Sequence, residues 1–350
     1  MWLARRLAQG YLFLHIHFVI LTKFFIVLGC RYYFPGAYEL TLKIIDVKPF
    51  PTPNIEWPTL GLLAFCFTTI ALLTMFGNTV PLWLSIPILS VALALHSSLQ
   101  HEVLHGHPFR NAYLNEALVF VPVGLFLPYR RFRDTHIAHH DDSRLTDPYD
   151  DPETNYMDPH VWHSLGKPMR IVLLFNNTLV GRILIGPLVG MLYFYKDDLR
   201  EMLRGNRQVI MPYVLHFAGL APLVWWLATV STLPLWAYAL AAYVGLGLLK
   251  IRTYLEHRAH ENIPARTVLI EDRGPLSVLF LNNNFHVVHH QFPKLPWYLI
   301  PKLYEANKEE FRQQNEGYAY KNYREIFKMY FFSRKDDVPH PLYALKNPKA

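Results

Sequence analysis

Histidine is the residue whose number and spacing first indicate chemistry in this chain. The 350-residue sequence contains 18 histidines, and the segment HVVHH at 286–290 places three of them at positions i, i+3 and i+4. On a helix these positions share one face, so the three imidazoles would point in the same direction. The segment HIAHH at 136–140 repeats the same form. Two copies of one uncommon spacing indicate a shared role.

Two further clusters lie near these segments. His101 and His105 in HEVLH stand four residues apart, which again places both on one helical face. His257 and His260 lie in EHRAHEN, ahead of the HVVHH segment. Four clusters in one protein are hard to explain as ordinary solvated polar faces, so we interpret them as parts of one site.

Many neutral imidazoles in one site are typical of metal binding. Imidazole suits zinc, copper, iron and nickel, and a catalytic zinc ion takes three protein ligands. Eight or nine histidines exceed one such site and fit two ions, each with an open position. Cys30 and Cys66 lie in apolar segments without a C-x-x-C pattern, which argues against thiolate chemistry. The residues therefore predict a histidine-rich two-metal site, with iron favoured.

The composition indicates a membrane protein around this site. Mean hydropathy is +0.11 although 17% of the residues are charged, because very apolar runs alternate with polar segments. A net charge of +7 could suggest nucleic acid. The basic residues, however, lie in segments between apolar runs, which is typical of loops that face an anionic leaflet. We therefore predict membrane lipid, and no nucleic acid, as a partner.

Four apolar runs have about the length of 20 residues that a hydrocarbon core requires. They cover 58–76, 81–99, 210–230 and 233–249. Very short connections join the first two runs and the last two runs, so each pair predicts a helical hairpin. The expected fold class is an all-α integral membrane protein. Its four transmembrane helices form two hairpins, and a helical cap holds the di-metal site.

Charge predicts which side of the membrane carries the site. The long polar segments include Arg130, Arg131 and Arg133 and lie on one side of the two hairpins. By the positive-inside rule this side is cytoplasmic. All four histidine clusters follow the second or the fourth run, so we expect them to meet at the cytoplasmic face.

The segments HEVLH, HIAHH and HVVHH resemble the three histidine boxes of the integral-membrane fatty acid desaturase superfamily. That superfamily also includes membrane hydroxylases and carotenoid ketolases. The resemblance covers about 95–300, including the order of spans and boxes. It implies a non-haem di-iron enzyme that uses O2 as co-substrate to introduce a double bond into a fatty acyl chain.

Two other functions remain as alternatives. A hydroxylase or ketolase of a lipid or carotenoid would use the same scaffold, because box spacing does not separate these reactions from desaturation. A histidine-rich metal transporter is a more remote alternative, since its ligands would lie in mid-membrane on facing spans.

The resemblance implies nine metal-ligating histidines by box position. Family members also use a histidine shortly after the fourth span, and here His257 and His260 compete for that role. We take His257, which is nearer the span and has Glu256 beside it. The expected ligands are His101, His105, His136, His139, His140, His257, His286, His289 and His290. No catalytic residue is expected beyond this metal centre.

Metal-bound histidines usually donate their second N–H to a carboxylate or a carbonyl. Candidates to contact the ligands, or to stand beside them, are His107, His260, Asp141, Glu256 and Asn284, and by proximity also Asp134, Asp142, Asp147 and Glu102. An alkyl substrate also needs a long apolar tunnel beneath the metals. We expect the second and fourth spans to line that tunnel.

The resemblance also implies partners. The substrate would be a fatty acyl lipid or an acyl thioester. No His-Pro-x-Gly motif of a cytochrome b5 domain occurs in the sequence, so we expect a separate electron donor of ferredoxin, rubredoxin or cytochrome b5 type. The basic face around Arg130, Arg131 and Arg133 is the expected docking site. Chain length, regiochemistry and head group are not specified by these residues.

The remaining boundaries follow from the apolar pattern. Residues 1–57 contain an apolar stretch at 11–29, which we interpret as interfacial rather than as a fifth span, followed by a proline-rich linker. Residues 58–330 form the membrane desaturase-like domain, and residues 331–350 form a C-terminal tail. We expect an integral, multi-pass protein of a bacterial inner membrane.

Overall fold

The computed structural model describes residues 50–343. The stretch at 11–29 and most of the expected N-terminal segment therefore lie outside the described residues. Within the described part, helices dominate, and the strands are the short parallel pair β1 (Leu269–Ile270) and β2 (Ala319–Tyr320). The helical character predicted from the sequence is confirmed for this part of the chain.

Four long helices within residues 50–343 are apolar enough to cross a membrane. Prolines stand at or just before the first turn of three of them, where the backbone N–H that proline lacks would have no helical partner. The helices match the four predicted spans, although the second continues past residue 99 and so carries His101 in its last turn. They are α2 (Trp57–Met75), α3 (Leu82–Leu104), α10 (Arg207–Thr229) and α11 (Leu235–Thr253).

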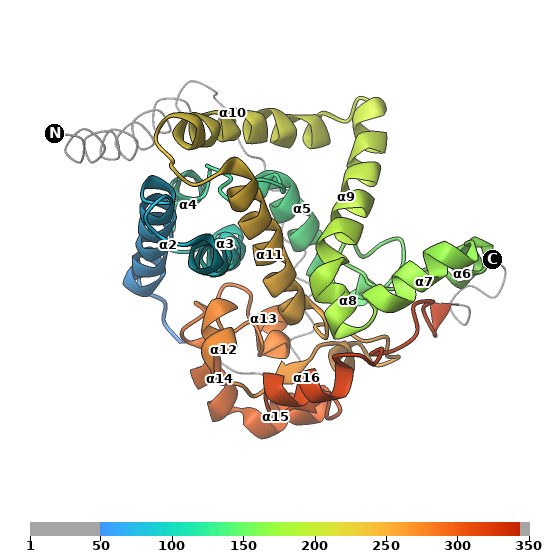
Figure 1. The fold of residues 1–350 in the computed structure, drawn as a ribbon. Coiled ribbons are helices and arrows are strands. Elements are labelled where there is room, and N and C mark those ends of the chain that lie inside the picture. The colour runs from blue at the N-terminus through green and yellow to red at the C-terminus, as the bar shows by residue number, and fades with distance from the viewer. Residues whose placement is uncertain (1–49, 344–350) are drawn as a thin grey trace.

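Helix α3 packs against both α2 and α11 (Figure 1). Gly245 of α11 permits the close approach to α3, because a Cβ atom at this position would lie 3.0 Å from the backbone oxygen of Ser90. Helix α10 packs against α5 and α9, and it meets α11 near their connection, where Trp226 and Ala237 are buried in one apolar cluster. The two-hairpin arrangement stays a prediction.

Shorter helices fill the two long segments that follow α3 and α11. After α3 come α4 (Ala112–Leu118), α5 (Tyr129–His139), η1 (Asp142–Arg144), α6 (Pro159–Ser164), α7 (Lys167–Asn176), α8 (Leu179–Leu184) and α9 (Gly186–Leu203). After α11 come η2 (Ile263–Arg266), α12 (Pro275–Leu279), α13 (His286–Gln291), α14 (Ile300–Ala306), α15 (Lys308–Gln314) and α16 (Tyr323–Tyr330).

The two segments join around the C-terminal ends of α3 and α11 (Figure 1). One buried apolar cluster there combines Leu99 of α3, Ile251 of α11, Phe280 after α12 and Ile326 of α16. Residues 331–343, which we expected to form a tail, also pack back onto the protein. His340 N, for example, donates to Met157 O at 2.8 Å. This packing positions the histidines described next.

Candidate metal centre

Three helices and one loop carry the histidines of the predicted boxes. Helix α3 carries His101 in its last turn, His105 directly follows the helix as its C-cap, and Gly106 (φ +104°) turns the chain away. Helices α5 and α13 each present their box on one face, as the i, i+3 and i+4 spacing predicted. The first residues after α11 bring His257 to the same place.

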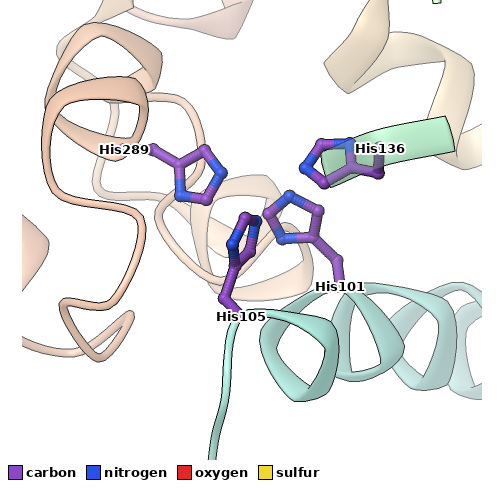
Figure 2. A group of neighbouring side chains, drawn as sticks. All are labelled: His101, His105, His136 and His289. Atoms are coloured by element: carbon purple, nitrogen blue, oxygen red, sulfur yellow. The ribbon is translucent and has the colours of Figure 1, made fainter. Parts of the chain in front are cut away.

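The first histidine group consists of His101, His105, His136 and His289. Each offers a ring nitrogen within 4.8 Å of the others. Figure 2 shows the four imidazoles converging from α3, α5 and α13, although these residues are far apart in the sequence. His140 adjoins this group, because its Nε2 lies 3.1 Å from His136 Nε2 and 3.2 Å from His289 Nε2.

The second group consists of His139, His257, His286 and His290, and all four side chains are buried. His257 Nε2 lies 2.9 Å from His139 Nε2 and 3.0 Å from His286 Nε2. The rings of His140 and His290 stack with their centres 4.3 Å apart, so the two groups adjoin. All nine histidines expected as ligands therefore lie in one region.

The nitrogen atoms fit a bound metal at each group. A neutral imidazole has one N–H, so His257 Nε2 cannot form good hydrogen bonds with two other Nε2 atoms at once. His101 Nε2, His105 Nε2 and His290 Nε2 are buried without a hydrogen-bond partner. Two nitrogens held at right angles about 2.1 Å from one ion would be about 3.0 Å apart. The observed Nε2 separations of 2.9 to 3.2 Å agree with that spacing.

Acidic and amide side chains hold the opposite ring nitrogens. Each contact fixes the orientation of an imidazole and leaves Nε2 facing into the group, as is common around protein-bound metals. The pairs are His136 Nδ1 with Glu153 (2.9 Å), His139 Nδ1 with Asp151 (2.7 Å), His290 Nδ1 with Asp142 (2.8 Å) and His286 Nδ1 with Asn283 (3.0 Å).

Of the candidates named from the sequence, Asp142 contacts a histidine, whereas Asp141 and Asn284 do not. Asp141 pairs with Arg144 at 3.0 Å on the surface, and the neighbouring Asp142 contacts His290 because the η1 turn begins there. Asn284 donates instead to Ile270 O at 2.6 Å, so it supports the backbone beside β1.

Glu256 lies nearer to the expected place. Its Oε1 is 3.8 Å from His286 Nδ1 and 2.9 Å from the guanidinium Nε of Arg252. The carboxylate is therefore beside the second group, and its ion pair with Arg252 connects the end of α11 to that group.

His107 and His260 point away from both groups. His107 pairs with Glu56, which immediately precedes α2, so it connects the end of α3 to the start of α2. His260 is partly exposed, with Nε2 3.5 Å from Glu316 Oε2. The structure thus brings His257, and not His260, into the second group.

Sequence reasoning did not single out Asp151, Glu153 or Asn283. The acidic run that follows the HIAHH segment was the available signal, but such a run is equally typical of a solvated loop. This acidic run folds back toward α5 through a turn in which Asp151 also accepts from Thr146 N at 2.8 Å. No helical or strand periodicity encodes that turn.

Burial controls the charge of most of these imidazoles. It lowers the pKa of His140, His257, His286 and His289 well below the ordinary value of 6.5, so these rings are neutral and keep a lone pair at neutral pH. Burial also acts on His139, but the Glu153 and Asp151 carboxylates outweigh it and raise the pKa of His139 to about 9. A metal ion at the second group would displace that proton.

An apolar cavity adjoins the first group. It lies between α3 and α11, with Leu93 on one wall and Ala242 and Leu246 on the other. Gln100 lines the cavity immediately before His101, and Phe132 lines it one turn before His136. We expected a long tunnel lined by the second and fourth spans; this cavity lies between those helices, and the long tunnel stays a prediction.

A model of the fatty acid desaturase family matches residues 77–322, a range that contains all nine histidines. The chain belongs to this family. Within residues 50–343, this desaturase-family protein has four helices that are long and apolar enough to cross a membrane, which together with its family indicates a membrane protein.

Individual relatives show two kinds of activity. The sn-2 acyl-lipid omega-3 desaturase (ferredoxin) of Arabidopsis thaliana chloroplasts is 24% identical over 242 residues, which are 60% of this chain and 51% of the plant protein. The chloroplastic omega-3 fatty acid desaturase of Brassica napus is 25% identical over 240 residues, which are 60% of this chain and 56% of that protein.

A beta-carotene ketolase of Paracoccus sp. is 25% identical over 224 residues, which are 63% of this chain and 74% of the ketolase. The chain thus spans about half the length of the two plant relatives and a larger share of the ketolase. Similarity to these relatives is therefore compatible with either activity, desaturation or ketolation.

Proposed function

We propose that this protein is an O2-dependent fatty acyl desaturase with two histidine-bound iron ions. The observation that carries the proposal is the meeting of two buried histidine groups with an apolar cavity between two membrane-type helices. An all-imidazole donor set suits iron, and no thiolate lies in either group. When bound, the two ions would activate the co-substrate O2, which is the oxidant that removes hydrogen from an unactivated C–H bond.

The chain itself would hold and orient these ions. His101, His105, His136 and His289, with His140 adjoining, would bind one ion. The other would be bound by His139, His257, His286 and His290. The carboxylates behind the rings set which nitrogen faces the metal, and they raise the basicity of that nitrogen.

The cavity would position the substrate. Its walls are mainly aliphatic, so an alkyl chain could replace water along them, and its position beside the first group would bring a carbon of the chain toward the ions. Phe132 contacts both regions, since its ring lies 5.8 Å from that of His136 and also lines the cavity. The substrate would be a fatty acyl lipid or an acyl thioester.

We propose a cytoplasmic site in a bacterial inner membrane, served by a separate electron donor of ferredoxin, rubredoxin or cytochrome b5 type. The three arginines expected to bind that donor are engaged within the chain. Arg131 pairs with the buried Asp198 at 2.6 Å, Arg130 pairs with Glu116, and Arg133 pairs with Asp134 at 2.8 Å. A donor would therefore meet paired guanidinium groups on this face.

Ketolation or hydroxylation of a lipid or carotenoid is the second candidate function. Similarity to a beta-carotene ketolase over 74% of that protein favours it. The cavity also has a polar strip on α3, formed by His96, Ser97 and Gln100. That strip would suit a product that carries oxygen better than an all-hydrocarbon chain.

Product analysis decides between these functions. The full chain is expressed with a ferredoxin and its reductase in a host whose membranes contain only saturated acyl chains, with and without a carotenoid. New double bonds in the acyl chains support desaturation, whereas carbonyl or hydroxyl groups alone support the second candidate. Absence of any oxidised product, together with absence of iron from the purified protein, would overturn both.

A further inference from the structure

Residues 333–340, which we name the C-terminal segment, contact the second histidine group from behind. They lie beyond the range of 77–322 that matches the family. The sequence alone suggested a tail here. The contacts of this segment instead reach two of the four histidines in that group.

Lys335 makes the most direct of these contacts. Its side chain is only 3% exposed, and its Nζ donates to the backbone oxygen of His257 at 2.9 Å. The same Nζ lies 3.6 Å from Asp336 Oδ2 and 5.4 Å from the centre of the Tyr156 ring. A buried ammonium group is costly unless such partners are present, so the position of Lys335 is closely constrained.

Tyr156 holds the same loop at a second point. Its hydroxyl oxygen accepts from Ala259 N at 2.9 Å, and its hydroxyl group donates to the Asp336 carboxylate. Lys335 thus holds the backbone at His257. Asp336 acts through Tyr156 and holds the backbone at Ala259, two residues later. Asn177 anchors them in turn, because its Nδ2 donates to Asp336 O at 2.7 Å.

His340 supports a different histidine of the same group. Its Nε2 lies 3.1 Å from Thr146 Oγ1. Thr146 N donates to one oxygen of Asp151 at 2.8 Å, and the other oxygen of Asp151 is 2.7 Å from His139 Nδ1. Both ends of the C-terminal segment therefore lead to the second group, but the route from His340 is shared, because Asp151 also accepts from the backbone N of Glu153 at 2.9 Å and Glu153 contacts His136. Within residues 50–343, no hydrogen bond joins this segment directly to His101, His105, His136 or His289.

We propose that Lys335 is a positioning residue for the second metal site, and that its contact with the backbone of His257 strengthens metal binding there and not at the first site. The proposal rests on the two-metal centre proposed above. Without Lys335, the loop after α11 would lose its support at His257 O. His257 Nε2 would then be held less precisely against the nitrogens of His139 and His286.

The test compares Lys335→Met with Lys335→Arg and with the matched control Lys321→Met, a change at an exposed lysine on another part of the fold. Each full-length protein is purified in detergent, stripped of metal and titrated anaerobically with Fe2+ alone. Bound iron per chain is measured by mass spectrometry, and thermal unfolding of the metal-free protein reports folding. The wild type and the control should bind two ions.

Lys335→Met should keep one tight ion and bind the other about 10- to 100-fold more weakly. Lys335→Arg, which retains a donor, should restore part of that affinity. Equal affinity for both ions in Lys335→Met, or equal weakening of both, would overturn the proposal. If Lys335→Met does not fold, Tyr156→Phe, which removes the acceptor for Ala259 N on the same loop, decides by the same selective loss at one site. A wild type that binds fewer than two ions would instead contradict the proposed function.

Discussion

Four of the nine histidines are oriented by a side chain that contacts the ring nitrogen behind them. Glu153, Asp151 and Asp142 each contact an Nδ1 atom, so the Nε2 atoms of His136, His139 and His290 face inward. The burial that keeps four other rings neutral also prevents water from competing for their lone pairs. The role of each side chain depends on its own contacts, so two residues that are adjacent in the sequence can have different roles.

Asp142 and Asp141 give a direct test of this orientation. Asp142→Asn removes the charge behind His290 with little change of shape, and we expect iron affinity at the second site to fall about 10- to 100-fold. Asp141→Asn alters an exposed ion pair with Arg144 and should leave iron binding unchanged. Anaerobic Fe2+ titration of the two variants measures the difference. Similar affinities would refute the role of Asp142.

His257 and His260 form a second matched pair. His257→Ala removes a nitrogen that lies within 3.0 Å of two others, so we expect loss of one iron ion per chain and of all oxidation activity. His260→Ala changes a partly exposed side chain near Glu316 and should retain both ions. Iron content and product yield of the two proteins check this prediction. The reverse pattern would show that His260 is the ligand.

At the scale of the element, two helices build both the site and its approach. Helix α3 carries His101 in its last turn and lines the cavity with the turns before it. Helix α11 supplies the opposite wall and leads into His257. A bulkier side chain on the cavity wall should therefore affect the substrate without changing the metals.

Ala242→Leu tests this separation. The added carbons enter the cavity from a fully buried position on α11, and we expect at least a tenfold loss of product from long-chain substrates with two iron ions still bound. The matched control is Val244→Leu on the partly exposed side of the same helix, which should keep near-normal activity. Product yield and iron content are measured together. Equal losses in both variants would indicate a general packing defect instead.

At the scale of the whole molecule, the histidine groups restrict the membrane topology. Residues before α10 and residues after α11 contribute to the same groups, so both segments must lie on one side of the bilayer. Helices α10 and α11 lie between these two segments in the sequence. If both helices span the membrane, the chain would cross the bilayer in α10 and return in α11. The connection between α2 and α3 should then lie on the opposite side.

Chemical labelling checks this topology. Single cysteines are placed at the exposed positions Arg144 and Lys321 and at Thr79 between α2 and α3, in a protein whose native cysteines have been replaced. A membrane-impermeant maleimide should label Thr79→Cys in intact cells. The other two should be labelled only in inverted vesicles, because the positive-inside rule places the basic segments in the cytoplasm. Labelling of Arg144→Cys and Lys321→Cys from different sides would contradict the shared site.

The sequence alone was sufficient to place the four apolar helices within a few residues and to predict which histidines lie close together. Both depend on local properties: the length of an apolar run and the i, i+3, i+4 spacing on a helix. Only the tertiary structure decided how those histidines divide. The adjacent His289 and His290 join different groups, and so do His136 and His139.

The reason for this division is geometric. His289 meets His140 across 149 residues of sequence, so its group depends on how α13 lies against α5. Turns and packing between distant segments likewise decide that Asp142, and not Asp141, contacts His290. They also bring Lys335 to the backbone of His257. Local spacing specifies a face of a helix, whereas the partner of that face is determined when the helices pack together.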